Sequence, residues 1–241
     1  MTPPRQILPG QTVFITCRAV GRTFRFVPKP EVVDTIRFCF VLAASKYRIQ
    51  VHEFLWMSNH FHMVVTAVDD ELPSFMQHLN SLTSRALNAL RGRSGANIEA
   101  HYNMVVVTDP AKILEHCAYT LANPCAANLV VRAEQWKGLS SYHLEYGQTL
   151  VAKRPKRGLW SEKRLKAEAA AEAKRRGRKG RKSAGRGKRR GRVVTPDEVS
   201  VTLTRPPGFD EMRDEDLRDE VRRQVVVRES EAEDLRAEEG R

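Results

Sequence analysis

Hydrophobic and polar positions repeat with two different periods along the first 125 residues of the chain. Runs rich in β-branched and aromatic residues predict strands at 12–20, 49–57, 60–68 and 103–109. Apolar residues at helical spacing predict helices at 30–48, 71–92 and 110–122. The resulting order β-α-β-β-α-β-α predicts an α+β fold: a ferredoxin-like antiparallel sheet with helices packed on it.

Local signals mark the ends of these elements. Gly92 follows the second helix, and Asp109 is placed to cap the third helix, with Pro110 in its first turn. Pro124 disfavours helical geometry at Asn123, so a kink or an end of the third helix is expected there.

Charge divides the chain into three parts. Residues 1–150 carry 14 basic and 11 acidic side chains, residues 151–195 carry 19 and 3, and residues 196–241 carry 8 and 15. We expect a folded domain at 1–150, a basic, disordered segment that binds nucleic acid at 151–195, and an acidic, partly helical tail at 196–241. The tail either folds back on the basic segment and competes with DNA or only keeps the protein soluble.

The basic segment is of low complexity, with glycine interrupting blocks of like charge. Lys and Arg at this density bind phosphates by releasing counterions, with little sequence preference. A solvated linker is the alternative. The candidate nucleic-acid-binding residues are Arg175, Arg176, Arg178, Lys179, Arg181, Lys182, Lys188, Arg189 and Arg190.

Cysteine usage and hydropathy indicate a cytoplasmic protein. The four cysteines show no C-x-x-C spacing and lie among apolar neighbours, so we expect buried free thiols in a reducing compartment. The N-terminal residues MTPPRQILPG contain no apolar stretch typical of a secretory signal. No run approaches the roughly 18 apolar residues that a membrane-spanning helix needs, so no membrane partner is expected.

Two histidines stand one residue apart in the stretch WMSNHFHMVV (56–65). Side chains two apart on a strand point the same way, so His60 and His62 are expected to project from one face while Phe61, Met63 and Val65 point into a core. Two parallel neutral imidazoles form half of a site for a divalent metal. On this pattern alone, histidines satisfied within the core are an equally good interpretation.

The third helix contains the stretch HCAYTLANP (116–124). Tyr119 and Asn123 are four residues apart and share one face of the helix. If that face packs over the histidine pair, the tyrosine is a candidate nucleophile and the Asn123 oxygen a third metal ligand. A half-buried packing role is the more common one for a helical tyrosine.

Taken together, these motifs resemble a known family. MSNHFHMVV, followed by YTLANPCAANLV and WKGLSSY, is similar to the single-tyrosine HUH transposases, and in particular to the REP-associated tyrosine transposases, which act at repetitive extragenic palindromes in bacteria. HUH denotes histidine, hydrophobic residue, histidine, here His60-Phe61-His62. The resemblance spans roughly residues 10–145 and implies the HUH endonuclease fold for that part of the chain.

The resemblance also implies a mechanism. Tyr119 matches the nucleophile, and His60, His62 and Asn123 match the ligands of Mg²⁺ or Mn²⁺. The implied reaction is cleavage and rejoining of single-stranded or hairpin DNA through a 5′-phosphotyrosine link, in a cytoplasmic, nucleoid-associated protein of bacteria. Whether the protein is a monomer or a homodimer is left open. The alternatives are a domesticated nuclease acting on chromosomal palindromes and a non-catalytic DNA-binding protein of the same fold.

Overall fold

An antiparallel sheet of four strands forms the centre of the protein. The computed structural model describes residues 8–156, 159 and 196–238. The strands lie in the order β2-β3-β1-β4, and each neighbouring pair is antiparallel. Their bounds are β1 (Gln11–Arg18), β2 (Ile49–Trp56), β3 (His60–Ala67) and β4 (Asn103–Val106). This order confirms the prediction of a ferredoxin-like α+β fold.

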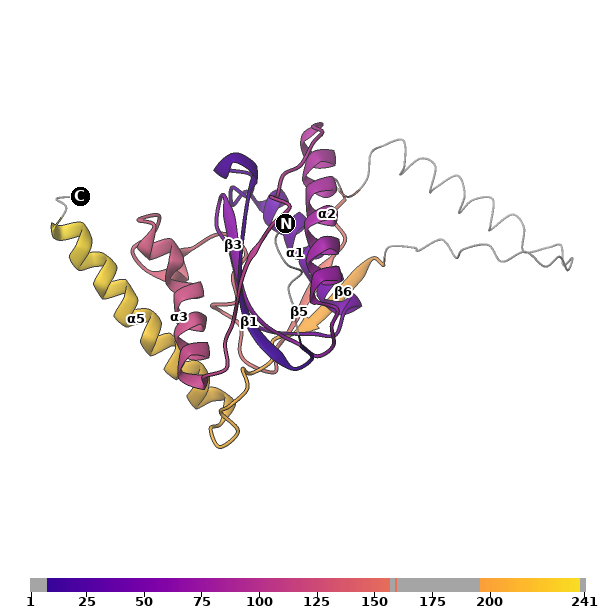
Figure 1. The fold of residues 1–241 in the computed structure, drawn as a ribbon. Coiled ribbons are helices and arrows are strands. Elements are labelled where there is room, and N and C mark those ends of the chain that lie inside the picture. The colour runs from indigo at the N-terminus through magenta and orange to yellow at the C-terminus, as the bar shows by residue number, and fades with distance from the viewer. Residues whose placement is uncertain (1–7, 157–158, 160–195, 239–241) are drawn as a thin grey trace, which may run out of the picture.

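Helices cover both faces of this sheet (Figure 1). On one face lie α1 (Pro30–Lys46) and α2 (Leu72–Arg91), and on the other lie α3 (Pro110–Ala126) and α5 (Asp214–Glu238). Among the described residues, two short 3-10 turns are the other helical elements: η1 (Val20–Arg22) and η2 (Ala133–Gln135). Because both faces are covered, β2 and β3 are buried along nearly their whole length.

The helix signals in the sequence act as expected. The Asp109 side chain accepts a hydrogen bond of 2.9 Å from the Ala111 backbone N–H at the start of α3. Gly92 ends α2 with φ of 63°, a left-handed conformation that glycine adopts without strain. Pro124 is the exception: α3 continues through it to Ala126, three residues beyond Asn123, where a kink or an end was expected.

A β-bulge interrupts the pairing of β2 with β3. Val51 pairs with Val65, but Glu53 pairs with Val64, so His52 is the extra residue. The bulge turns His52 and Glu53 to the same face, the face covered by α3. There the Nδ1–H of His52 donates to the Thr204 carbonyl (2.9 Å), and its Nε2 accepts from the Thr66 hydroxyl (2.8 Å). Two consecutive polar side chains are thereby buried in the sheet.

Glu53 is the centre of a buried polar cluster. Arg218 of α5 forms an ion pair with its Oε1, and both side chains are fully buried. The hydroxyls of Ser141 and Tyr146 also donate to the carboxylate. Burial raises the pKa of Glu53, and the Arg218 charge and these hydrogen bonds oppose that rise. The cluster joins β2, the segment after α3 and α5.

The described residues after Gln148 pack on the same core. Strands β5 (Thr149–Lys153) and β6 (Glu198–Thr202) form an antiparallel pair that lies against α1. The chain then reaches the edge of β2, where the Thr204 N–H donates to the Val51 carbonyl (2.8 Å). The predicted acidic tail is helical over α5, and this helix packs along α3. The described part of 196–241 shares the core of the first 150 residues.

The predicted free thiols have counterparts in the structure. Cys17, Cys39, Cys117 and Cys125 are all buried and unpaired. Among residues 8–156, 159 and 196–238, no helix is both long and apolar enough to cross a membrane.

We expect Arg218→Ala to lower the free energy of unfolding by about 3–5 kcal/mol, because it leaves Glu53 buried without its cation. Removing both charges with Glu53→Leu and Arg218→Leu should recover most of that loss. Urea unfolding of the unaltered protein, the Arg218→Ala variant and the double variant measures these differences in the free energy of unfolding. Arg223→Ala is the control, because its ion pair with Glu220 is on the surface (2.6 Å) and its loss should cost less than about 1 kcal/mol. Equal losses in the two single variants would contradict the prediction.

Stability should also fall in mild acid. Burial lowers the pKa of His52 from 6.5 to about 4. Below about pH 6.5 the unfolded chain therefore binds a proton that the folded protein refuses, and the free energy of unfolding falls as the pH drops. We expect this residue to account for a loss of about 2 kcal/mol between pH 7.5 and pH 5. In urea unfolding, His52→Gln should show a weaker pH dependence by that amount, and an unchanged dependence would refute the assignment.

Candidate active site

The candidate site lies where the start of β3 meets the last turns of α3. His60 and His62 project from β3 toward α3, as the alternation along the strand predicts. Tyr119 and Asn123 lie one turn apart on the facing side of α3, with Asn123 next to His60 and Tyr119 next to His62. The structure thus brings together the four residues that the sequence predicted for the reactive centre.

His60 faces Asn123 across a short gap. The Nε2 of His60 lies 3.3 Å from the Oδ1 of Asn123, and its Nδ1 lies 2.7 Å from the Oδ1 of Asn59. The Asn59 amide nitrogen donates to the Arg22 carbonyl (3.4 Å), which turns its Oδ1 toward His60. We therefore assign the His60 proton to Nδ1, where it bonds to Asn59. Two acceptor atoms, the bare Nε2 of His60 and the Oδ1 of Asn123, then face each other.

His62 is oriented in the same way by β1. Its Nδ1 lies 2.9 Å from the Thr16 hydroxyl oxygen, on the neighbouring strand. Its Nε2 is buried and has no hydrogen-bond partner among the described residues. With the proton on Nδ1, the Nε2 lone pair is directed into the site. A second neighbouring group thus orients the second imidazole.

Both imidazoles are held in the neutral form. Burial, together with smaller electrostatic contributions from His60 and Arg18, lowers the pKa of His62 to about 3. Burial also lowers the pKa of His60, and the hydrogen bond that a protonated Nε2 would donate to Asn123 opposes the shift. A neutral imidazole is the form that binds a metal ion.

The donor set fits a divalent cation. Two imidazole nitrogens and one amide oxygen converge, and a cation between them would satisfy the unpartnered His62 Nε2 and separate the two facing acceptors. No group of three His, Cys, Asp or Glu side chains stands at metal-binding distance among the described residues, so the amide oxygen is essential to this set.

Tyr119 is the most accessible member of the site. Its side chain is 39% exposed, and its ring stands edge-on to His62 with centroids 5.5 Å apart. Phe14 lies edge-on to the same ring at 5.8 Å and stacks against His62. On its other side, the guanidinium of Arg228 from α5 lies 5.8 Å from the ring centroid. The ring is thus held by packing while its edge stays open to solvent.

A hollow of about 440 Å³ opens above these side chains. We call it the reactive pocket; it is lined by Thr16, Arg18, His60, His62, Asn103, Tyr119, Asn123, Ala126 and Ala127. A smaller hollow of about 220 Å³ between α3 and α5 shares Tyr119 with it and adds Arg228. Two arginines therefore flank the tyrosine from opposite sides.

Sequence reasoning missed the groups that orient the site. Thr16, Asn59 and Arg228 escaped it because their contacts depend on strand register and on the packing of α5. Asn59 offered the one local signal, since it directly precedes His60. Two other histidines lie near these residues or on the same sheet. His116 stacks on Phe14 (4.4 Å), and His52 lies in the bulge of β2.

The other predicted residues fall into two groups. The segment after α3 packs along β2: the Trp136 Nε1–H donates to the Trp56 carbonyl (3.0 Å), and Ser141 reaches Glu53. Gly138 allows the close approach, because a Cβ there would lie 2.8 Å from the Trp56 carbonyl oxygen. Outside the described residues lie Arg175, Arg176, Arg178, Lys179, Arg181, Lys182, Lys188, Arg189 and Arg190.

If His62 binds a metal ion, losing its partner Thr16 should weaken that binding. We expect Thr16→Val to raise the Kd for Mn²⁺ about 10–100-fold, because the imidazole loses the hydrogen bond that orients it toward the site. Calorimetric titration with Mn²⁺ measures the change. Thr12→Val is a matched control on the same strand and face, since its hydroxyl contacts Thr66 instead (2.7 Å). Equal affinities in both variants would argue against a metal at His62.

Comparison with known proteins bears on the fold. No protein-family model matches the chain. No curated protein matches it either. Among solved structures, it is similar to a REP-associated tyrosine transposase bound to a REP hairpin, with a TM-score of 0.52 and 15% identity over 60% of this chain and 85% of that one. A protein of Deinococcus radiodurans R1 named as a transposase gives a TM-score of 0.35 at 15% identity, over 46% of this chain and 90% of that one, too low to bear on the fold. The chain therefore has the fold of a REP-associated tyrosine transposase, as the resemblance in its sequence predicted.

Proposed function

We propose that the protein cleaves and rejoins single-stranded DNA through a covalent link to Tyr119. One observation carries the proposal: α3 sets a tyrosine and an amide oxygen, one turn apart, against two neutral histidines of β3. A nucleophile, a set of cation ligands and two flanking arginines around one open pocket suit phosphodiester chemistry.

The covalent step is a transesterification. The Tyr119 oxygen attacks the phosphorus, the bond from phosphorus to the 3′-oxygen breaks, and a 5′-phosphotyrosine and a free 3′-hydroxyl result. The phenol proton leaves to solvent through the open edge of the ring, and the departing 3′-oxygen takes up a proton. Because the new ester keeps the energy of the old one, a 3′-hydroxyl can reverse the attack without ATP.

The residues around Tyr119 have distinct tasks in this scheme. His60, His62 and Asn123 would hold Mg²⁺ or Mn²⁺, which supplies Lewis-acid polarisation of the phosphate. Two imidazole ligands favour Mn²⁺ over Mg²⁺, since Mg²⁺ prefers oxygen. Arg18 and Arg228 carry positive charge to the two sides of Tyr119, where they can bind the phosphate and its neighbours.

The substrate is proposed from charge and from likeness of fold. The similar structure is that of a transposase bound to a REP hairpin, so hairpin DNA with an unpaired segment is the first substrate to try. The nine predicted basic residues between Arg175 and Arg190 would add affinity for phosphates without reading sequence.

Tyr119→Phe should abolish the covalent adduct, because the change removes the attacking oxygen and almost no packing volume. Incubating the protein with labelled single-stranded and hairpin oligonucleotides and Mn²⁺, followed by denaturing gels, measures the adduct. Chelation of the metal should also abolish it. Tyr142→Phe is the matched control and should leave the adduct unchanged. If the Tyr119 variant still forms an adduct, Tyr119 is not the nucleophile.

A further inference from the structure

Helices α3 and α5 pack together along their length but leave a hollow beside Tyr119, with a volume of about 220 Å³. We call it the helix pocket. Large apolar side chains are fully buried in the first half of α5: Leu217, Val221 and Val225. Where the second half of α5 passes Tyr119, the side chains between the two helices include Ala122, Ala126 and Ala232, which are too small to fill the space. The pocket thus results from a change in side-chain size along one helix pair.

The helix pocket adjoins the reactive pocket. Both are lined by Tyr119, Asn123 and Ala126, so the proposed nucleophile stands on the boundary between them. A strand that places a phosphate at Tyr119 continues on both sides of that phosphate. The helix pocket is therefore in the right place to receive the nucleotide next to the cut.

The lining of the helix pocket suits a flat ring. Its alanines supply an apolar floor, and Leu235 lines it with a side chain that is 60% exposed, which an occupant would cover. The Arg228 guanidinium lies 5.8 Å from the centroid of the Tyr119 ring at one wall. Aromatic rings and arginine side chains are the groups on which unpaired bases stack.

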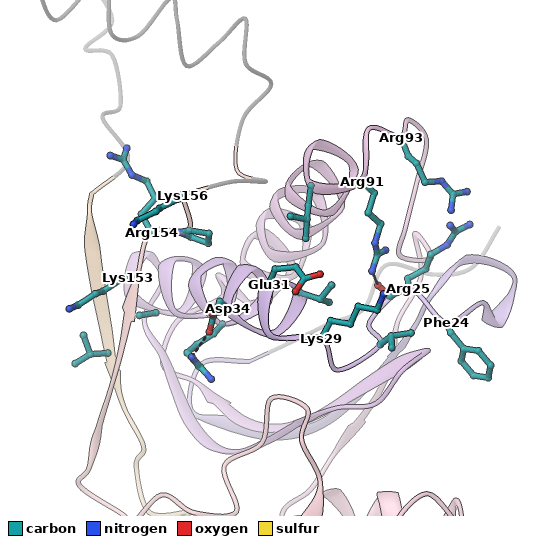
Figure 2. A pocket seen from close by; sticks show the side chains of 17 residues that line it. Phe24, Arg25, Lys29, Glu31, Asp34, Arg91, Arg93, Lys153, Arg154 and Lys156 are labelled. Carbon is teal, nitrogen blue, oxygen red and sulfur yellow. Dashed lines mark hydrogen bonds and ion pairs between the residues drawn. The ribbon is translucent and has the colours of Figure 1, made fainter.

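The charge in the helix pocket is nearly balanced. Two arginines, Arg228 and Arg236, and one carboxylate, Glu231, line it. The cleft between α1, α2 and β5 is different, because basic side chains outnumber acidic ones there by eight to two (Figure 2). A strongly positive cleft attracts phosphates, whereas a small pocket of mixed charge with an apolar floor favours a neutral ring.

Two polar side chains of the helix pocket have no partner within the described part of the chain. Neither the Glu231 carboxylate nor the Asn128 amide makes a hydrogen bond or an ion pair there. Asn128 follows α3 with φ of 56°, a conformation that asparagine tolerates, and its backbone N–H donates to the Cys125 carbonyl (3.0 Å). This turn holds the backbone of Asn128 at the pocket while its amide stays available.

The carboxylate of Glu231 can distinguish one base from another. An ionised carboxylate only accepts hydrogen bonds. Cytosine, adenine and guanine each carry an amino group that can donate to it. Thymine has no amino group and presents carbonyl oxygens, which a carboxylate repels.

We propose that the helix pocket holds an unpaired base next to the phosphate that Tyr119 attacks, and that Glu231 selects bases with an amino group over thymine. The inference rests on the proposed function for the choice of a DNA strand. It gives α5, which lies outside the first 150 residues, a part in choosing where the strand is cut.

Binding of oligo(dC) and oligo(dT) of equal length tests this proposal. The unaltered protein should bind oligo(dC) about tenfold more tightly, since one well-placed base contact contributes about that factor. Both strands carry the same phosphate charge, so phosphate contacts cancel in this ratio. Glu231→Gln should lower the ratio to about twofold or less, because an amide can also donate to a thymine carbonyl. Fluorescence anisotropy in EDTA, at a mildly alkaline pH that keeps cytosine neutral, measures both affinities.

Glu233→Gln is the matched control. It removes the same charge from an exposed position on α5, two residues farther along and outside the helix pocket. Its ratio should equal that of the unaltered protein. Equal affinities for the two strands in the unaltered protein, a ratio that survives Glu231→Gln or an equal loss in the control would overturn the proposal.

Free dCMP separates a base in a strand from a free nucleotide. At the same nucleotide concentration, dCMP should not displace oligo(dC), because it lacks the neighbouring phosphates that hold a strand in place. Displacement would assign the helix pocket to a free nucleotide and overturn the proposal. Since EDTA prevents cleavage in these measurements, failure of the Tyr119 chemistry would leave their result unaffected.

Discussion

The ion pair between Glu53 and Arg218 is the interaction on which the rest of the structure depends. A carboxylate inside a sheet is costly unless a cation and hydrogen-bond donors meet it, and here Arg218, Ser141 and Tyr146 do so. Because Arg218 belongs to α5, satisfying Glu53 draws that helix onto the protein, and α5 in turn packs along α3. Helix α3 is thereby held between the sheet and α5, at the height where Tyr119 and Asn123 meet the histidines. A buried charge far from Tyr119 thus helps to fix the position of that side chain.

The order of the elements could be predicted from the sequence because it depends on local periodicity. The site also depends on strand register and on how distant segments pack together. Alternation along β3 predicted that His60 and His62 share a face, and helical spacing predicted the same for Tyr119 and Asn123. That α3 covers the histidine face was not visible in either pattern; the family resemblance supplied it. The hydrogen bond from His62 to Thr16 follows from the register of β1 with β3, which no single strand encodes. The bulge at His52 likewise exists only in the pairing with β3.

Helix α5 shows why many alternating charges in a sequence can obscure a helix face that is buried in the structure. The sequence predicted an acidic, partly helical tail and left open whether it folds back on the basic segment or only keeps the protein soluble. In the structure Leu217, Val221 and Val225 recur at four-residue spacing and are all fully buried. The stripe is narrow because α5 covers a single neighbouring helix instead of a broad core. Arg218 beside it counted as one more surface charge in the sequence, since its partner Glu53 lies 165 residues away. The composition of a segment indicates the average environment of its residues but does not reveal a single stripe of buried ones.

The candidate metal site and the cleft lined by basic residues lie on opposite faces of the sheet. On the α3 face, burial keeps both histidines neutral and leaves lone pairs directed at one point, an environment that suits a cation. On the α1 and α2 face, eight basic side chains and two carboxylates line a wide cleft, and two of the eight, Arg37 and Arg154, form ion pairs with Asp34 and Asp197. The excess of positive charge suits a polyanion. If the eight cations lined the reactive pocket, their charge would oppose the binding of a metal ion there. Placing them behind the sheet avoids that conflict.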